Sequence, residues 1–261
     1  MKKTTTGIFL VLLLMVGAAQ AAELFGTVDA VAGAASLTGE NGTSAPIAAG
    51  TRVYVGQSIL TGADGEVHVV TADSGLIALR PNSSFRVDRY QAKGEATDEV
   101  AFSLLKGALR SITGWIAKRN PAAYSLSTNS TTIGVRGTDH ETAIIDTPDG
   151  AALPGTYDTV YEGATVMKNA QGSTEVHTGE SAYTARDARQ APALLAHRPE
   201  FLERRTLRIE QRIQQRKETL RADIHDRMQT GDNAHDDKPD ATERRERARQ
   251  LRDRRIQHRQ Q

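Results

Sequence analysis

The chain offers few side chains that could do chemistry, and the clearest group is Asp139-His140-Glu141. Carboxylates and imidazoles serve as metal ligands and as acid–base catalysts. In a β-strand, however, neighbouring side chains point to opposite faces, so Asp139 and Glu141 would share one face and His140 would point to the other. His68 and His177 lie in other predicted strands and could in principle join His140. Because no partner is close in sequence, we expect neither a metal nor another cofactor.

Other catalytic signatures are missing from the sequence. There is no cysteine to act as a nucleophile, and there is no Gly-x-Ser-x-Gly turn of the kind that presents a nucleophilic serine. The acidic residues are scattered, so no pair of carboxylates suited to glycoside hydrolysis can be picked out. The single tryptophan, Trp115, is better explained by packing at the edge of a core than by sugar binding. We therefore predict no catalytic residue and no enzyme.

One short motif combines glycines with a charged side chain. Gly134 and Gly137 flank Arg136, and Thr138 follows. Glycines at this spacing allow a tight backbone path, and a guanidinium has five donors that could tie loop carbonyls or a carboxylate together. Either acidic residue of the group above could supply that carboxylate. We interpret Gly134, Arg136, Gly137 and Thr138 as a structural motif around a buried or half-buried arginine, with a ligand-binding arginine as the alternative.

Short strands must position these residues. Residues 66–71, 84–90 and 142–146 are examples of short runs rich in β-branched and aromatic residues, and clusters of Gly, Pro, Asn and Asp separate such runs. This pattern predicts a mainly β, multi-stranded domain. It leaves open whether the domain is a sandwich, a jelly-roll-like barrel or a short β-helix.

The N-terminus has the features of an export signal. Two lysines precede an apolar run at 8–16, and small residues at 19 and 21 form a cleavage site. The run is about half of the roughly 20 residues that a membrane span needs, so an uncleaved anchor is the less favoured reading. We predict a signal peptide over residues 1–21 and a mature protein that is periplasmic or secreted.

Charge and composition change near residue 186. Residues 23–185 contain 11 Lys and Arg against 18 Asp and Glu, a net charge of −7, whereas residues 186–261 contain 20 against 14, a net charge of +6. Glycine also becomes rare after this point. The change predicts a β-domain over 22–185, a linker and amphipathic helix over 186–229, and a charged helical or disordered tail over 230–261.

An amphipathic helix is predicted from Pro199 to Met228. Its apolar residues form one narrow stripe of Leu202, Ile209, Ile213, Leu220, Ile224 and Met228. The stripe suits a helix that lies on the β-domain, or a helix that pairs with a partner as in a coiled coil. For the Arg-rich tail we favour solvated, internally paired charges, with attraction to an anionic surface or weak docking on the acidic β-domain as alternatives. Nucleic acid is not expected as a partner of an exported protein.

The order of segments in the first half is similar to that of a known family. It starts at Gly26-Thr27-Val28, continues through 49–62, 76–85 and 104–110, and closes with Ile133-Gly134-Val135-Arg136-Gly137-Thr138. This layout resembles the FecR domain of bacterial envelope proteins over residues 26–145, with 155–185 as a β extension.

The resemblance implies an all-β periplasmic domain. In the namesake family this domain relays the ligand state of an outer-membrane receptor to a cytoplasmic sigma factor, through a cytoplasmic segment and one membrane span. The export signal of this chain departs from that plan. What the resemblance implies here is therefore the fold, the compartment and a bias towards protein recognition.

From these features we expect a non-enzymatic periplasmic interaction or signalling-accessory protein that recognises another envelope protein. The alternative is an envelope carbohydrate- or polymer-binding module, with a polysaccharide or an anionic surface as its ligand. A small-molecule sensor would need a pocket, which a sequence does not reveal.

Overall fold

The structure, a computed structural model, describes residues 22–204 and 207–236, with side chains up to residue 229. The predicted signal peptide and residues 237–261 of the predicted tail lie outside the described residues. No helix in the described part of the chain is long and apolar enough to cross a membrane.

The described chain is mainly β, as the sequence predicts, and it ends in a helix. The strands are β1 (Leu24–Ala32), β2 (Ala35–Thr38), β3 (Ser44–Pro46), β4 (Arg52–Tyr54), β5 (Ser58–Thr61), β6 (Glu66–Thr71), β7 (Leu76–Leu79), β8 (Ser84–Gln91), β9 (Glu99–Ile112), β10 (Tyr124–Ser127), β11 (Thr132–Ile145), β12 (Gly155–Asn169), β13 (Gly172–His177), β14 (Ser181–Ala185) and β15 (Ala193–Leu194). The helices are α1 (Trp115–Arg119), the 3-10 turn η1 (Pro121–Ala123), α2 (Glu200–Glu203) and α3 (Gln211–Asp236).

The strands form one mixed sheet that folds over onto itself. The long strand β9 shows how this happens, because its residues 99–106 pair with β8 whereas its residues 107–112 pair with β11 and, in part, β7. Strands β11 and β12 change register between residues 136 and 139, so they bend at the same level. Two layers result. The front layer holds β2, β5, β8, β10, β13 and one half of each long strand; the back layer holds β1, β4, β6, β7, β14 and the other halves.

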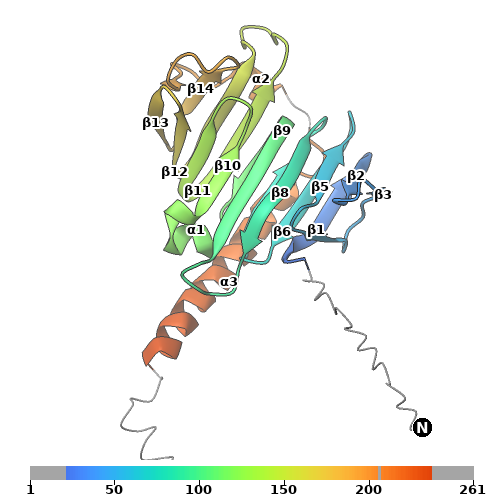
Figure 1. The fold of residues 1–261 in the computed structure, drawn as a ribbon, viewed down its shortest axis with the longest axis vertical. Coiled ribbons are helices and arrows are strands. Elements are labelled where there is room, and N and C mark those ends of the chain that lie inside the picture. The colour runs from blue at the N-terminus through green and yellow to red at the C-terminus, as the bar shows by residue number, and fades with distance from the viewer. Residues whose placement is uncertain (1–21, 205–206, 237–261) are drawn as a thin grey trace, which may run out of the picture.

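Figure 1 views the front layer, with β12, β11, β9, β8 and β5 side by side and α3 behind them. Of the three architectures that the sequence left open, this doubled sheet is closest to a sandwich. An aromatic cluster joins its layers from inside. The Phe25 ring of β1 lies 6.0 Å from Phe85 of β8 and 5.2 Å from Phe102 of β9, measured between ring centroids. All three rings are fully buried or nearly so, and each contributes about 2 kcal/mol by leaving water.

Glycines in the left-handed region of φ mark the bends of the long strands. Gly107, Gly137 and Gly163 have φ values of 79°, 59° and 80°. Residues with a Cβ rarely adopt such angles. At Gly163 the close approach of another strand adds a second constraint, because a Cβ there would lie 2.4 Å from the carbonyl oxygen of Gly137. The tight backbone path predicted at Gly137 is thus confirmed, whereas Gly134 has no neighbour within 4 Å of the position of a Cβ.

A graded series of alanine substitutions tests this account. We expect Gly163→Ala to lower the free energy of unfolding by at least about 2 kcal/mol, because strain and a backbone clash add. Gly137→Ala should cost about 1 kcal/mol, from the dihedral angle alone. Gly134→Ala is the matched control and should leave stability within about 0.5 kcal/mol of the native value. Urea denaturation measures all three, and an equal loss in each would contradict the role given to the bends.

Candidate functional site

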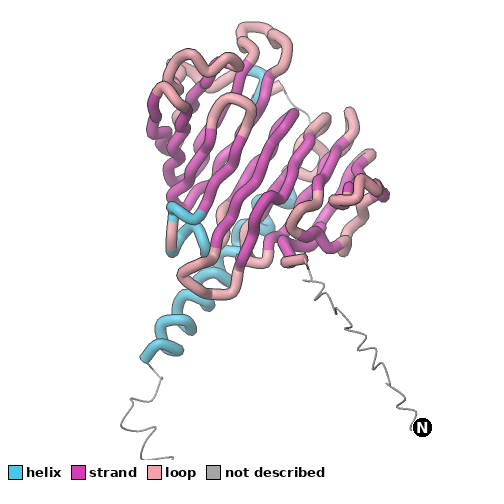
Figure 2. The backbone as a smooth tube through the Cα atoms, viewed as in Figure 1, coloured by secondary structure: helices cyan, strands magenta, loops and turns pink. Residues whose placement is uncertain are grey.

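Helix α3 lies on the outer face of the back layer. Its apolar side chains Ile213 and Leu220 are buried against Leu76, Ala78 and Ile112 of the sheet. The prediction that this stripe lies on the β-domain is therefore confirmed. Figure 2 shows that the C-terminal end of α3 projects beyond the strands.

The predicted bounds of this helix are wrong. The sequence predicted one helix from Pro199 to Met228, but the chain forms the single turn α2, leaves the helical path, and starts α3 only at Gln211. Two contacts explain the break. Phe201 of α2 is buried against Tyr157, with ring centroids 5.2 Å apart. Downstream, the Glu66 carboxylate accepts hydrogen bonds from the backbone N–H groups of residues 208 and 209, at 2.7 and 3.3 Å, and so holds the chain at the sheet just before α3.

The sheet face beneath α3 is charged. Because side chains alternate along a strand, one face of the back layer carries the apolar core residues, and the other carries acids and bases beside the apolar residues that α3 covers. Six titratable side chains of this outer face are each less than 8% exposed: Glu66, His68, Arg80, Arg110, Asp139 and Glu141. We call these six residues the charged face.

Two bidentate ion pairs organise the charged face. Arg110 donates through Nε and Nη2 to the two carboxylate oxygens of Asp139, at 2.7 and 2.8 Å. Arg80 donates in the same way to Glu141, at 3.2 Å for both bonds. Tyr161 of β12 joins the two pairs, since its hydroxyl donates to Glu141 at 3.0 Å and its ring lies 4.3 Å from the Arg110 guanidinium carbon. The planar fork of arginine suits this bidentate geometry.

The helical arm adds a second layer of ion pairs. Glu210, just before α3, accepts hydrogen bonds from Nη1 of both Arg80 and Arg110. Lys217 of α3 lies 2.5 Å from an oxygen of Asp139 and 2.9 Å from one of Glu162. Further ion pairs join Arg216 to Asp29 and Arg221 to Glu162. The arm is therefore held by charges as much as by its thin apolar stripe.

The electrostatics keep this interface ionised. Burial alone would raise the pKa of Asp139, but hydrogen bonds from Arg110 and Lys217 outweigh it and hold that pKa below its usual value. Burial would also lower the pKa of Arg80 and Arg110, yet the neighbouring carboxylates raise both. Each arginine of the face and its carboxylate partner thus stabilise one another, as buried charges require.

The buried arginines are not the one that the sequence singled out. Arg136 is exposed, on the outer face of the front layer, so the prediction of a buried or half-buried guanidinium there is wrong. The carboxylates expected to bind it are engaged by Arg110 and Arg80 instead. The Gly137 bend separates Arg136 from that layer. Thr138 is buried, and its backbone N–H donates to the Thr113 hydroxyl at 2.9 Å, a structural contact. Strand alternation places Arg80 and Arg110 on an outward face, but it does not show that α3 covers that face, so the sequence analysis missed them.

The group Asp139-His140-Glu141 divides between the two faces, as predicted. His140 points into the core, where its Nδ1 lies 2.8 Å from Asp158. The hydroxyls of Thr142 and Thr165 donate to the same carboxylate, at 2.7 and 2.6 Å. All four side chains are less than 2% exposed, so the cluster lies inside the domain. Within residues 22–204 and 207–229, no group of three His, Asp or Glu side chains is arranged to hold a metal.

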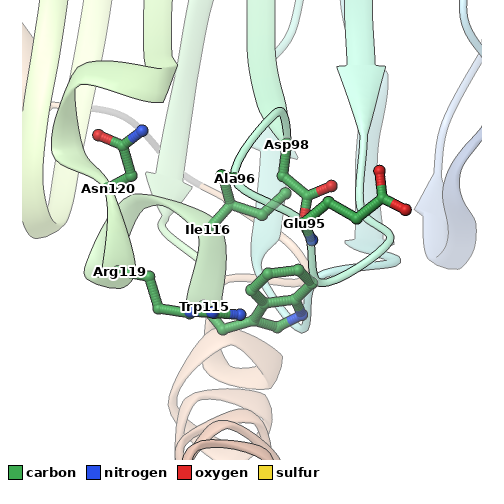
Figure 3. A pocket seen from close by; sticks show the side chains of 7 residues that line it. All are labelled: Glu95, Ala96, Asp98, Trp115, Ile116, Arg119 and Asn120. Atoms are coloured by element: carbon green, nitrogen blue, oxygen red, sulfur yellow. The ribbon is translucent and has the colours of Figure 1, made fainter. Parts of the chain in front are cut away.

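A shallow pocket of about 230 Å³ lies where the loop before β9 meets α1. Figure 3 shows Trp115 at its base, Glu95 and Asp98 on one side, and Arg119 and Asn120 on the other. Trp115 is only 4% exposed and belongs to the main core, as predicted from its sequence context. The Asp98 carboxylate accepts three backbone N–H bonds from residues 93–95, at 2.7 to 3.0 Å, so it serves to hold the loop.

His68 is a buried base within the charged face. It is 0% exposed, and neither ring nitrogen has a hydrogen-bond partner among the residues that the structure describes. Burial lowers its pKa to about 4, and the nearby cation Arg80 acts in the same direction. Arg212 also lowers the pKa, whereas the acids Glu210 and Asp29 oppose the shift. His68 is therefore neutral beneath the docked arm.

The Asp139→Asn variant tests the importance of the paired charges. It should lower the free energy of unfolding by about 3–5 kcal/mol, because Arg110 would lose its buried bidentate counter-charge and keep only Glu210, whose side chain is 33% exposed. Arg89→Gln is the control, since Arg89 and Glu99 form an exposed pair, with side chains 63% and 44% exposed. That variant should show no measurable change. Urea denaturation at neutral pH separates the two cases, and similar losses in both would contradict the argument.

A second prediction concerns pH. Since the pKa of His68 is lower in the folded state than its usual value of 6.5, unfolded or undocked chains take up a proton more readily, and stability must fall as pH falls from about 6.5 to 4. The full effect is roughly 3 kcal/mol. His68→Leu should flatten this part of the stability curve, measured by urea denaturation at several pH values. A variant curve parallel to that of the native chain would refute the assignment.

Comparison with known proteins agrees with the observed fold. Residues 57–164 match the family model described as FecR protein. Two crystal structures, described as those of a "putative anti-sigma factor" from Parabacteroides distasonis ATCC 8503, show a likeness with 9% and 10% sequence identity and a TM-score of 0.43. The likeness covers 56% of this chain and 62% of the other protein, so this chain spans less than two thirds of that protein's length.

Among curated proteins none matches this chain. The family model agrees with the resemblance seen in the sequence and shifts its bounds from 26–145 to 57–164. A FecR domain therefore occupies residues 57–164 of this chain.

Proposed function

We propose that this chain is a non-enzymatic interaction or signalling-accessory protein of the bacterial periplasm. Its FecR domain recognises another envelope protein, and its helical arm controls access to part of the domain. The presence of a FecR domain supports a regulatory role, since the family resemblance implies recognition and relay rather than catalysis. The export signal expected at residues 1–21 supports the compartment.

The single observation that carries the proposal is the contact between α3 and the charged face. Few large apolar side chains of the arm are buried, chiefly Ile213, Leu220 and Ile224, and the remaining contacts are largely ion pairs. Polar interfaces of this kind resemble transient contacts between proteins more than the interior of a domain. An arm held in this way suits a regulated contact better than a permanent core element.

The proposal assigns one role to each of the three segments predicted from the sequence. Residues 22–185 serve as the recognition domain, 186–229 as the arm, and 230–261 as a charged tail. The outer face of the front layer, which carries Gly134 and Arg136, is open to solvent and offers a second surface for a partner.

Photocrosslinking in bacterial cells tests this proposal. A photoreactive residue replaces Arg136 on the front layer or Glu218 on the exposed side of α3, and adducts are identified by mass spectrometry after cell fractionation. We expect one envelope protein to dominate the adducts in the periplasmic fraction, while the same residue at Arg189, far out on an exposed loop with its side chain 85% exposed, gives none.

Other outcomes would overturn parts of the proposal. Recovery of the full-length precursor in the cytoplasm would exclude the compartment. Retention of the purified chain on peptidoglycan or exopolysaccharide, without protein adducts, would replace protein recognition with the polymer-binding alternative.

A further inference from the structure

Arg80 and Arg110 form a pair of donors aimed at one point. Each guanidinium uses Nε and Nη2 for its carboxylate in the sheet, which leaves Nη1 directed outwards. Both Nη1 groups meet on Glu210, where Arg110 donates to Oε1 at 2.7 Å and Arg80 donates to Oε2. Two fixed donors thus bind the two oxygens of a single carboxylate.

The two arginines are held more firmly than the Glu210 carboxylate that they bind. The side chains of Arg80 and Arg110 are 3% and 8% exposed. The side chain of Glu210 is 33% exposed and lies outside the sheet, just before α3. Tyr161 packs on Arg110 and binds Glu141, so the receptor side is fixed within the sheet. Preorganised donors of this kind lose little freedom when they bind an anion.

Arg80 and Arg110 keep their counter-charges in the sheet when Glu210 moves away. Arg80 remains paired with Glu141, and Arg110 with Asp139, so neither guanidinium is left without a counter-charge. Replacement of Glu210 by another carboxylate restores the same number of charge-assisted hydrogen bonds. Exchange of one carboxylate for another therefore avoids the large cost of breaking a buried ion pair.

We propose that Arg80 and Arg110 form a carboxylate-binding site, which Glu210 occupies in the free protein and which an acidic side chain of a partner protein occupies in the complex. The ligand is a monoanion rather than a phosphate dianion, because Asp139 and Glu141 lie beside the site and would repel added negative charge. The identity of the ligand as a protein side chain rests on the proposed function, whereas the carboxylate-binding site rests on the geometry of Arg80 and Arg110 alone.

Chemical rescue with acetate tests the site in the full-length chain. In Glu210→Ala the carboxylate is missing, so we expect amide hydrogen exchange in the first turns of α3 to rise by about tenfold. Sodium acetate should reverse this rise in a saturable way, whereas sodium chloride at equal ionic strength should not. Glu218→Ala, on the exposed side of α3, is the matched control. Its amide exchange should match that of the native chain, with or without acetate.

A second variant covers the case in which Glu210→Ala does not fold. Glu210→Gln keeps the size of the side chain and removes its charge, and the same saturable protection of α3 by acetate is expected. Exchange unchanged in both variants, or a rise that acetate leaves in place, would overturn the proposal. Because no partner enters this experiment, its failure would leave the proposed function standing, and an absence of crosslinked partners would leave the carboxylate site standing.

Discussion

The structure depends on the burial of the Arg110–Asp139 pair at the centre of the back layer. A buried charge is tolerated only beside an opposite charge with good hydrogen-bond geometry. That requirement constrains β9 and β11 to one register, in which Arg110 lies opposite Glu141 and reaches Asp139 diagonally. A slip by one residue would turn the charges into the aromatic core and the apolar residues outwards. The ion pair therefore specifies the sheet, whatever its net contribution to stability.

The same constraint explains why the arm is needed and why only one of its buried side chains, Ile224, packs into the main core. Once the sheet charges are paired with each other, water is the main alternative neighbour for their remaining donors. Glu210, just before α3, accepts hydrogen bonds from the arginines in place of water, Lys217 of α3 donates to Asp139, and the helix adds only a narrow apolar stripe. Regions with few buried apolar contacts open at lower free energy than the core strands. We therefore expect the arm to open at lower free energy than the strands of the β-domain.

Much of this fold could be predicted from the sequence, but its central site could not. Strand alternation predicted the β-rich body and the division of Asp139, His140 and Glu141 between two faces. The stripe of Ile213, Leu220 and Ile224 predicted a helix that lies on the sheet. Alternation does not say, however, which face a distant segment will cover. For that reason Arg136, between two glycines, was chosen, while Arg80 and Arg110 at the ends of ordinary strand runs were missed. The start of α3 depends on Glu66, about 140 residues earlier, and local propensity carries no trace of that contact.

The bend of the sheet gives the molecule two outer surfaces with different physical character. The front face is open, and it carries exposed apolar side chains, Leu60, Leu105 and Val166, together with Arg136. The back face is covered, and its charges meet solvent only when α3 moves. Both faces are lined by the same three long strands, which cross from one layer to the other at Gly107, Gly137 and Gly163. Helix α3 contacts Ile112 of β9, Asp139 of β11 and Glu162 of β12, which lie on the back halves of these strands, while the front halves of the same strands form the open surface. The covered surface and the open surface are therefore built on the same continuous strands.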